Sequence, residues 1–396
     1  MRKVFLGVLA LALFTLPLQA EESMNPIITA MPSLSIAPDA HAGGLGDVGA
    51  ATTPDLNSQH WNPAKYAFME SHGGLTASYT PWLRKLVSDI DLAYLAGYYK
   101  WSEYDAIGAS FTYFSLGAVQ LTTESADFLA EARPNEWALD VSYSRKLHEY
   151  VSMAVALRFM YSDLNNGVNQ AATSSATELY PGWTMAADVA LYYKQPIELP
   201  MGTSYIAAGM NISNLGGKIS YDENNHSNFI PANLRIGVSY ELAFDSYNRL
   251  SVNADINKYL VPTRKSKFAL DADGNELTGD ALTNWYSGIS SPRGWAMSFA
   301  DAPGGFAEEM REIQFGLGLE YSYNRQFFGR LGYSHENRWK GNRRYVTIGA
   351  GFNLSIFSLD VAYVVATSAA NPLDQTLRFT VGFDLAGIKD LVNNRR

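Results

Sequence analysis

Residues 151–162 read VSMAVALRFMYS, and this stretch decides the fold class of the 396-residue chain. Large apolar side chains occupy every second position, while the positions between them are mostly small or polar. The apolar set is Val151, Met153, Val155, Leu157, Phe159 and Tyr161. Successive side chains of a β-strand point to opposite faces, so the stretch predicts a strand with one apolar face and one mixed face.

The same alternation recurs along the chain and predicts fourteen strands. Their expected ranges are 73–80, 89–100, 104–116, 136–147, 150–163, 182–194, 203–213, 232–243, 248–258, 311–324, 327–335, 343–354, 356–366 and 375–385. Most have roughly 9–13 residues, which is the length of a tilted strand that crosses a membrane. Lipid cannot satisfy an open sheet edge, so we expect an all-β fold: a closed 14-stranded antiparallel transmembrane β-barrel over residues 73–385.

The connections between these strands alternate in length. Short connections are expected at 101–103, 148–149, 244–247, 325–326 and 355, and long ones at 117–135, 164–181, 214–231 and 259–310. Outer-membrane barrels have short periplasmic turns and long outside loops, whereas a soluble β-sandwich has no reason to sort its loops in this way. Tyrosines and tryptophans also gather near the expected strand ends, as in the aromatic girdles of membrane barrels.

The two ends of the chain differ from the rest. Arg2 and Lys3 precede an apolar run, Val4–Leu16, which predicts that residues 1–20 are a signal peptide cleaved near Ala20. Residues 386–396 form a polar, basic tail that we expect in the periplasm. We therefore expect the mature chain in the outer membrane of a Gram-negative cell, as a multi-pass barrel.

Composition excludes several classes of function. The net charge is −9 and only 17% of residues are charged, whereas nucleic-acid binding favours a basic excess. The chain has no cysteine, which excludes disulfides, thiolate metal sites and cysteine nucleophiles. We expect no nucleic-acid partner.

Residues 21–72 precede the first strand and are too rich in Gly, Ala and Pro for a strand or a long helix. We expect this segment to fold into the barrel lumen as a plug, where its backbone groups would find partners. Its glycines would permit tight turns, and Trp61 with Pro63 would wedge against the wall. The candidate plug residues are Gly43, Gly44, Gly46, Gly49, Trp61, Asn62 and Pro63.

The catalytic, cofactor-binding and metal-binding motifs in this sequence are incomplete. Gly44–Gly49 matches G-x-G-x-x-G but lacks the strand and helix of a dinucleotide site, and Asp271–Glu276 resembles a calcium loop with its glycine misplaced. We therefore expect no catalytic residues, no cofactor and no metal site. Charges of both signs on the expected inward face predict a salt-bridge network that holds the plug; a polar conduit is the alternative.

Two stretches of the plug segment are more specific. Pro38-Asp39-Ala40 and the stretch from Asn57 to Lys65, NSQHWNPAK, resemble the PorV family of type IX secretion proteins, whose barrels are FadL-like. The resemblance covers nearly the whole chain, and it implies a protein that is not an enzyme. It implies a shuttle that binds the C-terminal signal domain of secreted cargo at the outer-membrane translocon. The shuttle then carries the cargo to a cell-surface attachment complex with a sortase-like protease. The expected partners are thus cargo, the translocon, the attachment complex and outer-membrane lipid.

An alternative function is that of FadL-type transporters, which carry fatty acids or other hydrophobic small molecules; a purely structural barrel or porin is a third. The longest connection, 259–310, is the candidate partner-binding loop, because Trp, Tyr and Arg are the usual interface anchors. Its candidate residues are Phe268, Trp285, Tyr286, Arg293, Trp295 and Phe299. A loop that packs on itself as a cap over the barrel mouth fits the same residues, and both interpretations stay open.

Overall fold

The computed structural model describes residues 24–84, 87, 89–122, 128–166, 180–222, 226–354, 356–367 and 373–385. The expected signal peptide, 1–20, and C-terminal tail, 386–396, lie outside the described residues, as does most of the connection 164–181. No helix of the described residues has the length and apolar character needed to cross a membrane.

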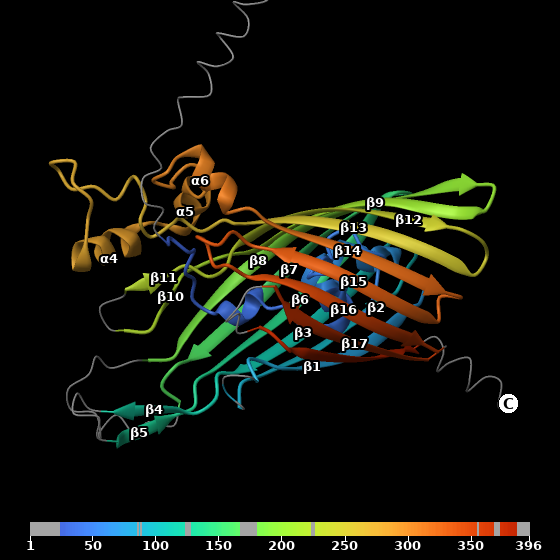
Figure 1. Ribbon diagram of the computed structural model, residues 1–396, viewed down its shortest axis with the longest axis horizontal. Helices are drawn as coiled ribbons and strands as arrows, with labels where there is room; N and C mark the ends of the chain where they lie inside the picture. Colours follow the sequence, from blue (N-terminus) through green and yellow to red (C-terminus); the bar gives the residue numbers. More distant parts are fainter. Residues whose placement is uncertain are drawn as a thin grey trace, which may run out of the picture.

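Fourteen antiparallel strands close into a barrel, which confirms the predicted fold class (Figure 1). They are β1 (Gly73–Pro81), β2 (Asp91–Lys100), β3 (Asp105–Ser115), β6 (Asn135–His148), β7 (Val151–Asp163), β8 (Gly182–Leu199), β9 (Gly202–Gly216), β12 (Asn233–Ala243), β13 (Asn248–Tyr259), β14 (Gln314–Tyr323), β15 (Phe327–His335), β16 (Arg344–Asn353), β17 (Phe357–Ala366) and β18 (Leu377–Asp384). Each pairs with its neighbours in the chain order of the barrel strands, and β1 pairs with β18 to close the ring. In that closing pair Gly74 lies opposite Asp384, and Tyr79 lies opposite Phe379.

The two faces of the wall follow the alternation of the sequence. Along β7, Leu157 is 62% exposed on the outer face, while its neighbour Arg158 is 6% exposed toward the lumen. Large apolar side chains cover the outside, where lipid is their solvent, and polar side chains face inward. Near one rim of the barrel the rings of Trp137 and Tyr161 stack with their centroids 5.4 Å apart.

The ends of the barrel are unequal (Figure 1). At one end, the short-turn end, a few residues join the two strands of each hairpin that turns there. At the other, the long-loop end, lie two hairpins and three helices. These are β4 (Val119–Thr122) with β5 (Phe128–Ala132), β10 (Ile219–Ser220) with β11 (Ser227–Asn228), α4 (Gly279–Gly288), α5 (Ser291–Met297) and α6 (Phe306–Arg311). The three helices lie in the longest connection, where the alternation pattern indicated only a loop.

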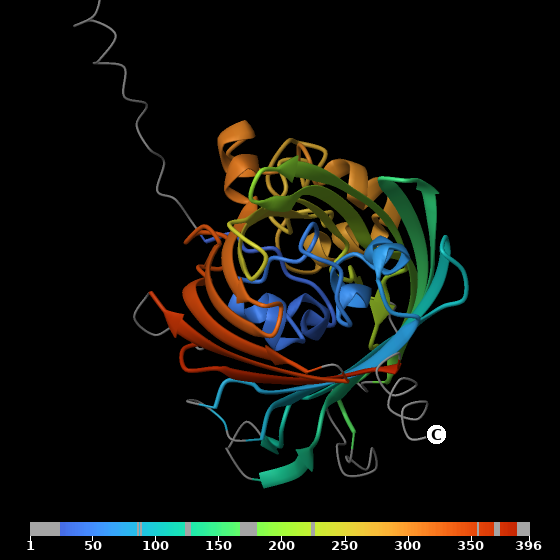
Figure 2. The same ribbon diagram turned by 90° about the vertical axis from the view of Figure 1, so that its right-hand side faces the viewer.

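Most of the segment 24–72 lies inside the ring of strands (Figure 2). Its elements are η1 (Pro32–Ser35), α2 (Ala40–Gly44), α3 (Ser58–Trp61) and η2 (Pro63–Phe68). These helices are short because proline opens η1 and η2, and two glycines end α2. Asp39 caps α2, since its Oδ1 accepts a hydrogen bond from the Ala42 N–H at 2.9 Å. We refer to residues 24–72 below as the plug.

Candidate functional site

The plug touches the wall with its backbone at the end of α2. Gly46 has φ +74°, and a Cβ on it would lie 2.6 Å from the backbone nitrogen of Tyr333 in β15. A Cβ on Gly44 would lie 3.1 Å from the Cα of Gly349 in β16. Wall glycines therefore meet plug glycines, and side chains at these positions would separate the two surfaces.

Gly43 and Gly49 make room for side chains instead. A Cβ on Gly43 would lie 2.5 Å from Nη1 of Arg378, and one on Gly49 would lie 2.4 Å from Cγ of Trp61. The Trp61 indole N–H donates to Asp39 Oδ2 at 2.6 Å, and its ring faces the Arg235 guanidinium at 4.3 Å. Trp61 thus packs inside the plug and against β12 of the wall.

Asn62 joins the plug to β8. Its Nδ2 donates to the carbonyl oxygens of Ala50, at 2.9 Å, and of Leu191 in the wall, at 3.0 Å. Its Oδ1 accepts from the Ala64 N–H at 3.1 Å, and Pro63 between them opens η2. The structure therefore places the seven candidate plug residues at contacts with the wall or within the plug core.

Buried charges on the wall bind the plug at two further places. Arg378 Nη1 lies 2.8 Å from Asp47 Oδ1, and the Tyr345 hydroxyl donates to the same carboxylate. Asp255 Oδ2 in β13 accepts from the backbone N–H groups of Gly49, at 2.8 Å, and Ala50, at 2.9 Å. These contacts fix the turn after α2 to separate strands of the wall, β13, β16 and β18.

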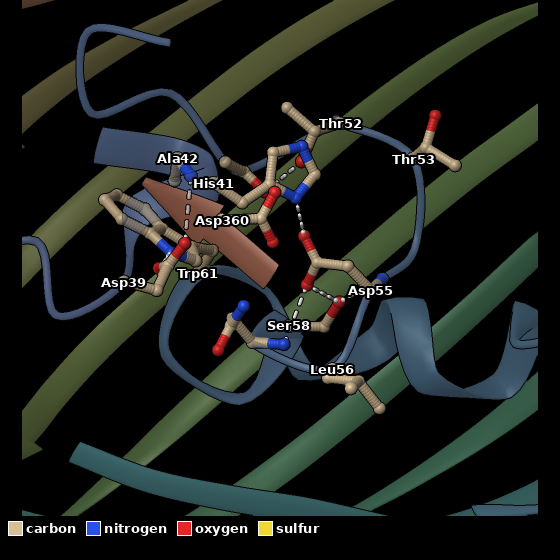
Figure 3. Close-up of polar contacts among 12 residues, drawn as sticks. Asp39, His41, Ala42, Thr52, Thr53, Asp55, Leu56, Ser58, Trp61 and Asp360 are labelled. Atoms are coloured by element: carbon tan, nitrogen blue, oxygen red, sulfur yellow. Dashed lines mark hydrogen bonds and ion pairs between the residues drawn. The ribbon is translucent and has the colours of Figure 1, made fainter. Parts of the chain in front are cut away.

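Three further plug side chains, those of His41, Asp55 and Lys65, take part in this interface, although no sequence pattern singles them out. The His41 ring lies 2.8 Å from Asp55 (Figure 3). Its other nitrogen lies 3.2 Å from Glu320 of β14. Lys65 Nζ donates to the Gly49 carbonyl at 3.1 Å and to Thr52 Oγ1 at 2.9 Å. All three lie within the plug segment, but no sequence spacing indicates which charges meet when an irregular segment folds.

Other inward charges pair across the wall itself. Arg158 lies against Asp140, at 2.5 Å, and Asp188, at 3.0 Å. Arg330 lies 2.6 Å from Glu320, with Asp360 as its second partner at 2.5 Å. These inward charges therefore form salt bridges within the wall, and Arg378 and Glu320 also pair with the plug.

A cavity between the plug and the wall lies near the long-loop end, and most of its lining is polar. Polar members of the lining include Asn211, Asn233, Arg235, Asn257, Gln314 and Arg343. Within the described residues, no group of three or more His, Asp or Glu side chains is arranged to hold a metal ion. Amide and guanidinium groups therefore make up much of the lining, beside apolar residues such as Leu34, Trp82 and Phe315.

In the Asp271–Glu276 turn, the Asp271 carboxylate accepts hydrogen bonds from backbone N–H groups of the same turn. Asp271 Oδ1 accepts from the N–H groups of Asp273, at 2.9 Å, and Asn275, at 2.8 Å. The Asn275 bonds are the largest contribution that lowers the pKa of Asp271. The acidic group thus closes a tight turn.

The longest connection, residues 260–313, folds on itself; we call it the loop cluster. Tyr286 and Ile289 pack with Val261 and with Phe229 of a neighbouring loop. The Tyr286 hydroxyl donates to the Pro262 carbonyl at 3.2 Å. Lys218 Nζ donates to three carbonyls at the end of α4, those of Tyr286, Ser287 and Ile289, at 2.9–3.1 Å.

The six candidate partner-binding residues divide into two groups. Phe268, Arg293 and Phe299 are exposed, whereas Trp285 and Trp295 are partly buried and Tyr286 is 5% exposed. Tyr286 belongs to the core of the loop cluster, because α4 turns it inward, so it is not available to a partner. Phe306, which is 80% exposed on α6, and the exposed Met310 also lie on this surface, although the aromatic and arginine pattern did not single them out.

The family follows from one comparison. A family model described as type IX secretion system protein PorV matches residues 19–266. The chain belongs to the PorV family. As a PorV-family barrel, it is an outer-membrane component of type IX secretion in a Gram-negative cell. No curated protein matches the sequence.

Solved structures of similar fold include hydrocarbon channels and transporters. The TodX deltaS2S3 mutant monoaromatic hydrocarbon channel is 12% identical with a TM-score of 0.53, covering 87% of this PorV-family chain and 98% of its own. The Pseudomonas putida toluene transporter TodX is 10% identical with a TM-score of 0.51, covering 92% and 99%. A Pseudomonas aeruginosa FadL homologue is 11% identical with a TM-score of 0.43, covering 91% and 100%. At such identities the first two show that the fold is shared, and nothing about what the PorV-family chain binds.

Proposed function

We propose that this protein binds the C-terminal signal domain of secreted cargo at the translocon and carries the cargo to an attachment complex with a sortase-like protease. Its part is binding, without catalysis. In this proposal the long-loop end faces outward, as in other outer-membrane barrels, and the wall contacts outer-membrane lipid. The loop cluster is then the surface that meets the cargo or the translocon.

The observation that carries the proposal is the pairing of a packed base with an exposed apolar rim. Tyr286 and Ile289 hold the cluster together, while Phe268, Phe299 and Phe306 are exposed on it. Aromatic side chains bury a large area at low rotamer cost, and a folded base reduces the ordering entropy that binding would otherwise cost.

The two interpretations of the loop left open by the sequence combine here. The cluster packs on itself, as a cap would, and it also keeps several apolar side chains in water. A soluble cap gains nothing from an 80% exposed Phe306, whereas a docking surface does.

The transport of fatty acids or other hydrophobic molecules receives less support from this lumen. The plug contacts the wall through its backbone and through ion pairs such as Asp47–Arg378. The lining of the cavity beside the plug includes Arg235, Asn211 and Arg343. An apolar ligand would have to desolvate these groups without replacing their hydrogen bonds.

The test is capture of a purified C-terminal signal domain by the detergent-extracted, heat-modifiable barrel. We expect the triple variant Phe268→Ser, Phe299→Ser, Phe306→Ser to assemble normally and to lose binding at least about tenfold. Phe128→Ser is the matched control, because Phe128 is 65% exposed on the separate β4–β5 hairpin. Equal binding by the triple variant and the native protein would show that the loop cluster does not bind the signal domain.

A further inference from the structure

The plug runs through the lumen in one direction. Ile36 packs against Leu92 and Phe114, which lie at the long-loop ends of β2 and β3. Farther along the plug, the ring of Tyr66 stacks on Tyr98, near the short-turn end of β2, with centroids 4.9 Å apart. The chain therefore enters the lumen from the long-loop end and leaves it at the start of β1 (Figures 1 and 2).

The first described residues are fastened among the long loops. The Asn25 N–H donates to the Trp339 carbonyl at 3.0 Å, and its Nδ2 donates to Glu308 Oε1 of α6 at 3.1 Å. Lys340 Nζ lies 2.6 Å from the same Glu308 oxygen. Asn25 thus joins two connections, that between β15 and β16 and that between β13 and β14.

Apolar and backbone contacts hold the next residues in the same place. Ile27 packs against the apolar core that Phe229 forms with Val261, Tyr286 and Ile289 of the loop cluster. The Ala30 N–H donates to the Phe229 carbonyl at 2.8 Å. Ile28, between them, is 57% exposed and borders a groove whose other side includes Glu312, Lys340 and Arg343.

We infer that residues 24–31 lie on the cell-surface side of the membrane and form one wall of the partner-binding surface together with the loop cluster. The inference rests on the proposed function for the outward orientation of the long loops. The occupant of the groove is the same cargo signal domain, because the groove is continuous with the loop cluster through Glu312 and the Asn25–Glu308 contact.

The chain offers a clean test of location because it contains no cysteine. Met24→Cys and Ile28→Cys are labelled in intact cells with a bulky, membrane-impermeant maleimide. Phe306→Cys is the outward control, and Glu70→Cys, on a side chain 89% exposed near the start of β1, is the periplasmic control. We expect Met24→Cys and Ile28→Cys to react like Phe306→Cys, and Glu70→Cys to react only after the outer membrane is permeabilised.

Lack of labelling at both N-terminal positions, while Phe306→Cys reacts, would overturn the inference and leave the orientation intact. Labelling of Glu70→Cys but not Phe306→Cys in intact cells would overturn the orientation and with it the proposed function. An Asn25→Cys, Trp339→Cys pair should also form a disulfide in assembled protein, whereas Asn25→Cys with Glu70→Cys should not. Absence of the first cross-link would contradict the observed path of the segment.

Footprinting tests the contribution of the segment to binding. A saturating purified signal domain should reduce maleimide labelling of Ile28→Cys several-fold, as it does for Phe306→Cys. Protection of Phe306→Cys alone would remove residues 24–31 from the binding surface. Protection of neither would contradict the proposed function instead.

Discussion

The plug interface and the loop cluster are both irregular chain held against the barrel, yet they are built in opposite ways. In the plug, Gly44 and Gly46 bring backbone against backbone, and Asp47 is fixed by Arg378. In the loop cluster, side chains such as Tyr286 form a small apolar core, and Phe306 is left in water. Close backbone packing suits a part that stays in place, whereas a side-chain core under an exposed rim suits a part that binds.

The largest expected effect comes from a side chain at the plug interface. Gly46→Val forces a β-branched residue to φ +74° and places its Cβ 2.6 Å from the Tyr333 nitrogen. Strain and overpacking together should cost about 2–5 kcal/mol, lowering the temperature at which the barrel unfolds on a gel. Gly329→Val, on β15 of the wall, is the control, because Gly329 has no positive φ and nothing lies within 4 Å of a Cβ there. Equal losses in the two variants would show that the plug contact itself contributes nothing.

The loop cluster should respond to loss of its core without affecting the barrel. Tyr286→Ala should destabilise residues 260–313 by about 3 kcal/mol, since it empties a buried aromatic site. Amide exchange in the cluster should rise while the unfolding temperature of the barrel stays unchanged. Tyr286→Phe, which loses only the bond to Pro262, should cost about 1 kcal/mol. A barrel that unfolds earlier in Tyr286→Ala would mean that the two regions are one cooperative unit.

A smaller effect is expected from the ion pair between plug and wall. Asp47→Ala leaves Arg378 buried without its carboxylate, at a cost of about 2 kcal/mol, given that the Asp47 side chain is 22% exposed. The surface pair Arg84–Asp91 is the control, with side chains 42% and 34% exposed, and Arg84→Ala should cost well under about 1 kcal/mol. Urea unfolding of the two variants in one detergent measures the difference, and equal midpoints would contradict it.

The smallest effect is a pH dependence of the loop cluster. Burial raises the pKa of Asp301 to about 7, although its Oδ2 accepts from the Thr263 N–H at 2.7 Å. A carboxyl whose pKa is raised by folding favours the folded loop when protonated. This contribution is full below about pH 4 and is lost as the pH rises through about 7. Amide exchange at Thr263 should therefore be several-fold faster at pH 8 than at pH 5, after correction for intrinsic exchange. Asp301→Asn keeps the acceptor and should abolish that difference.

The barrel could be predicted from the sequence because lipid imposes one rule on every strand. Alternation such as that of Val151–Ser162 reports directly which face meets lipid, so all fourteen strands were located. Helices α4 to α6 could not be predicted, since helices this short depend on tertiary contacts such as the capping of α4 by Lys218. For the same reason, the sequence could not reveal that Tyr286 packs into the apolar core of the loop cluster.

The glycines of the plug could be singled out, but their partners could not. Composition indicates that Gly46 permits close approach, whereas the choice of Tyr333 as its neighbour depends on how the segment lies in the lumen. The direction of the plug through the barrel leaves no trace in local sequence patterns, and only the contacts of Asn25 and Tyr66 reveal it.

The plug passes through the barrel that the rest of its own chain closes, so the chain threads through its own ring of strands. Fourteen strands return the chain to the face where β1 begins, and the single passage through the lumen adds one more crossing, so residues 24 and 385 lie at opposite ends of the barrel. The seam between β1 and β18 must therefore close around a segment already inserted, or the free end must slide through the finished ring. A folded domain fused to the N-terminus is too wide to slide, so such a fusion would assemble only by the first order of events.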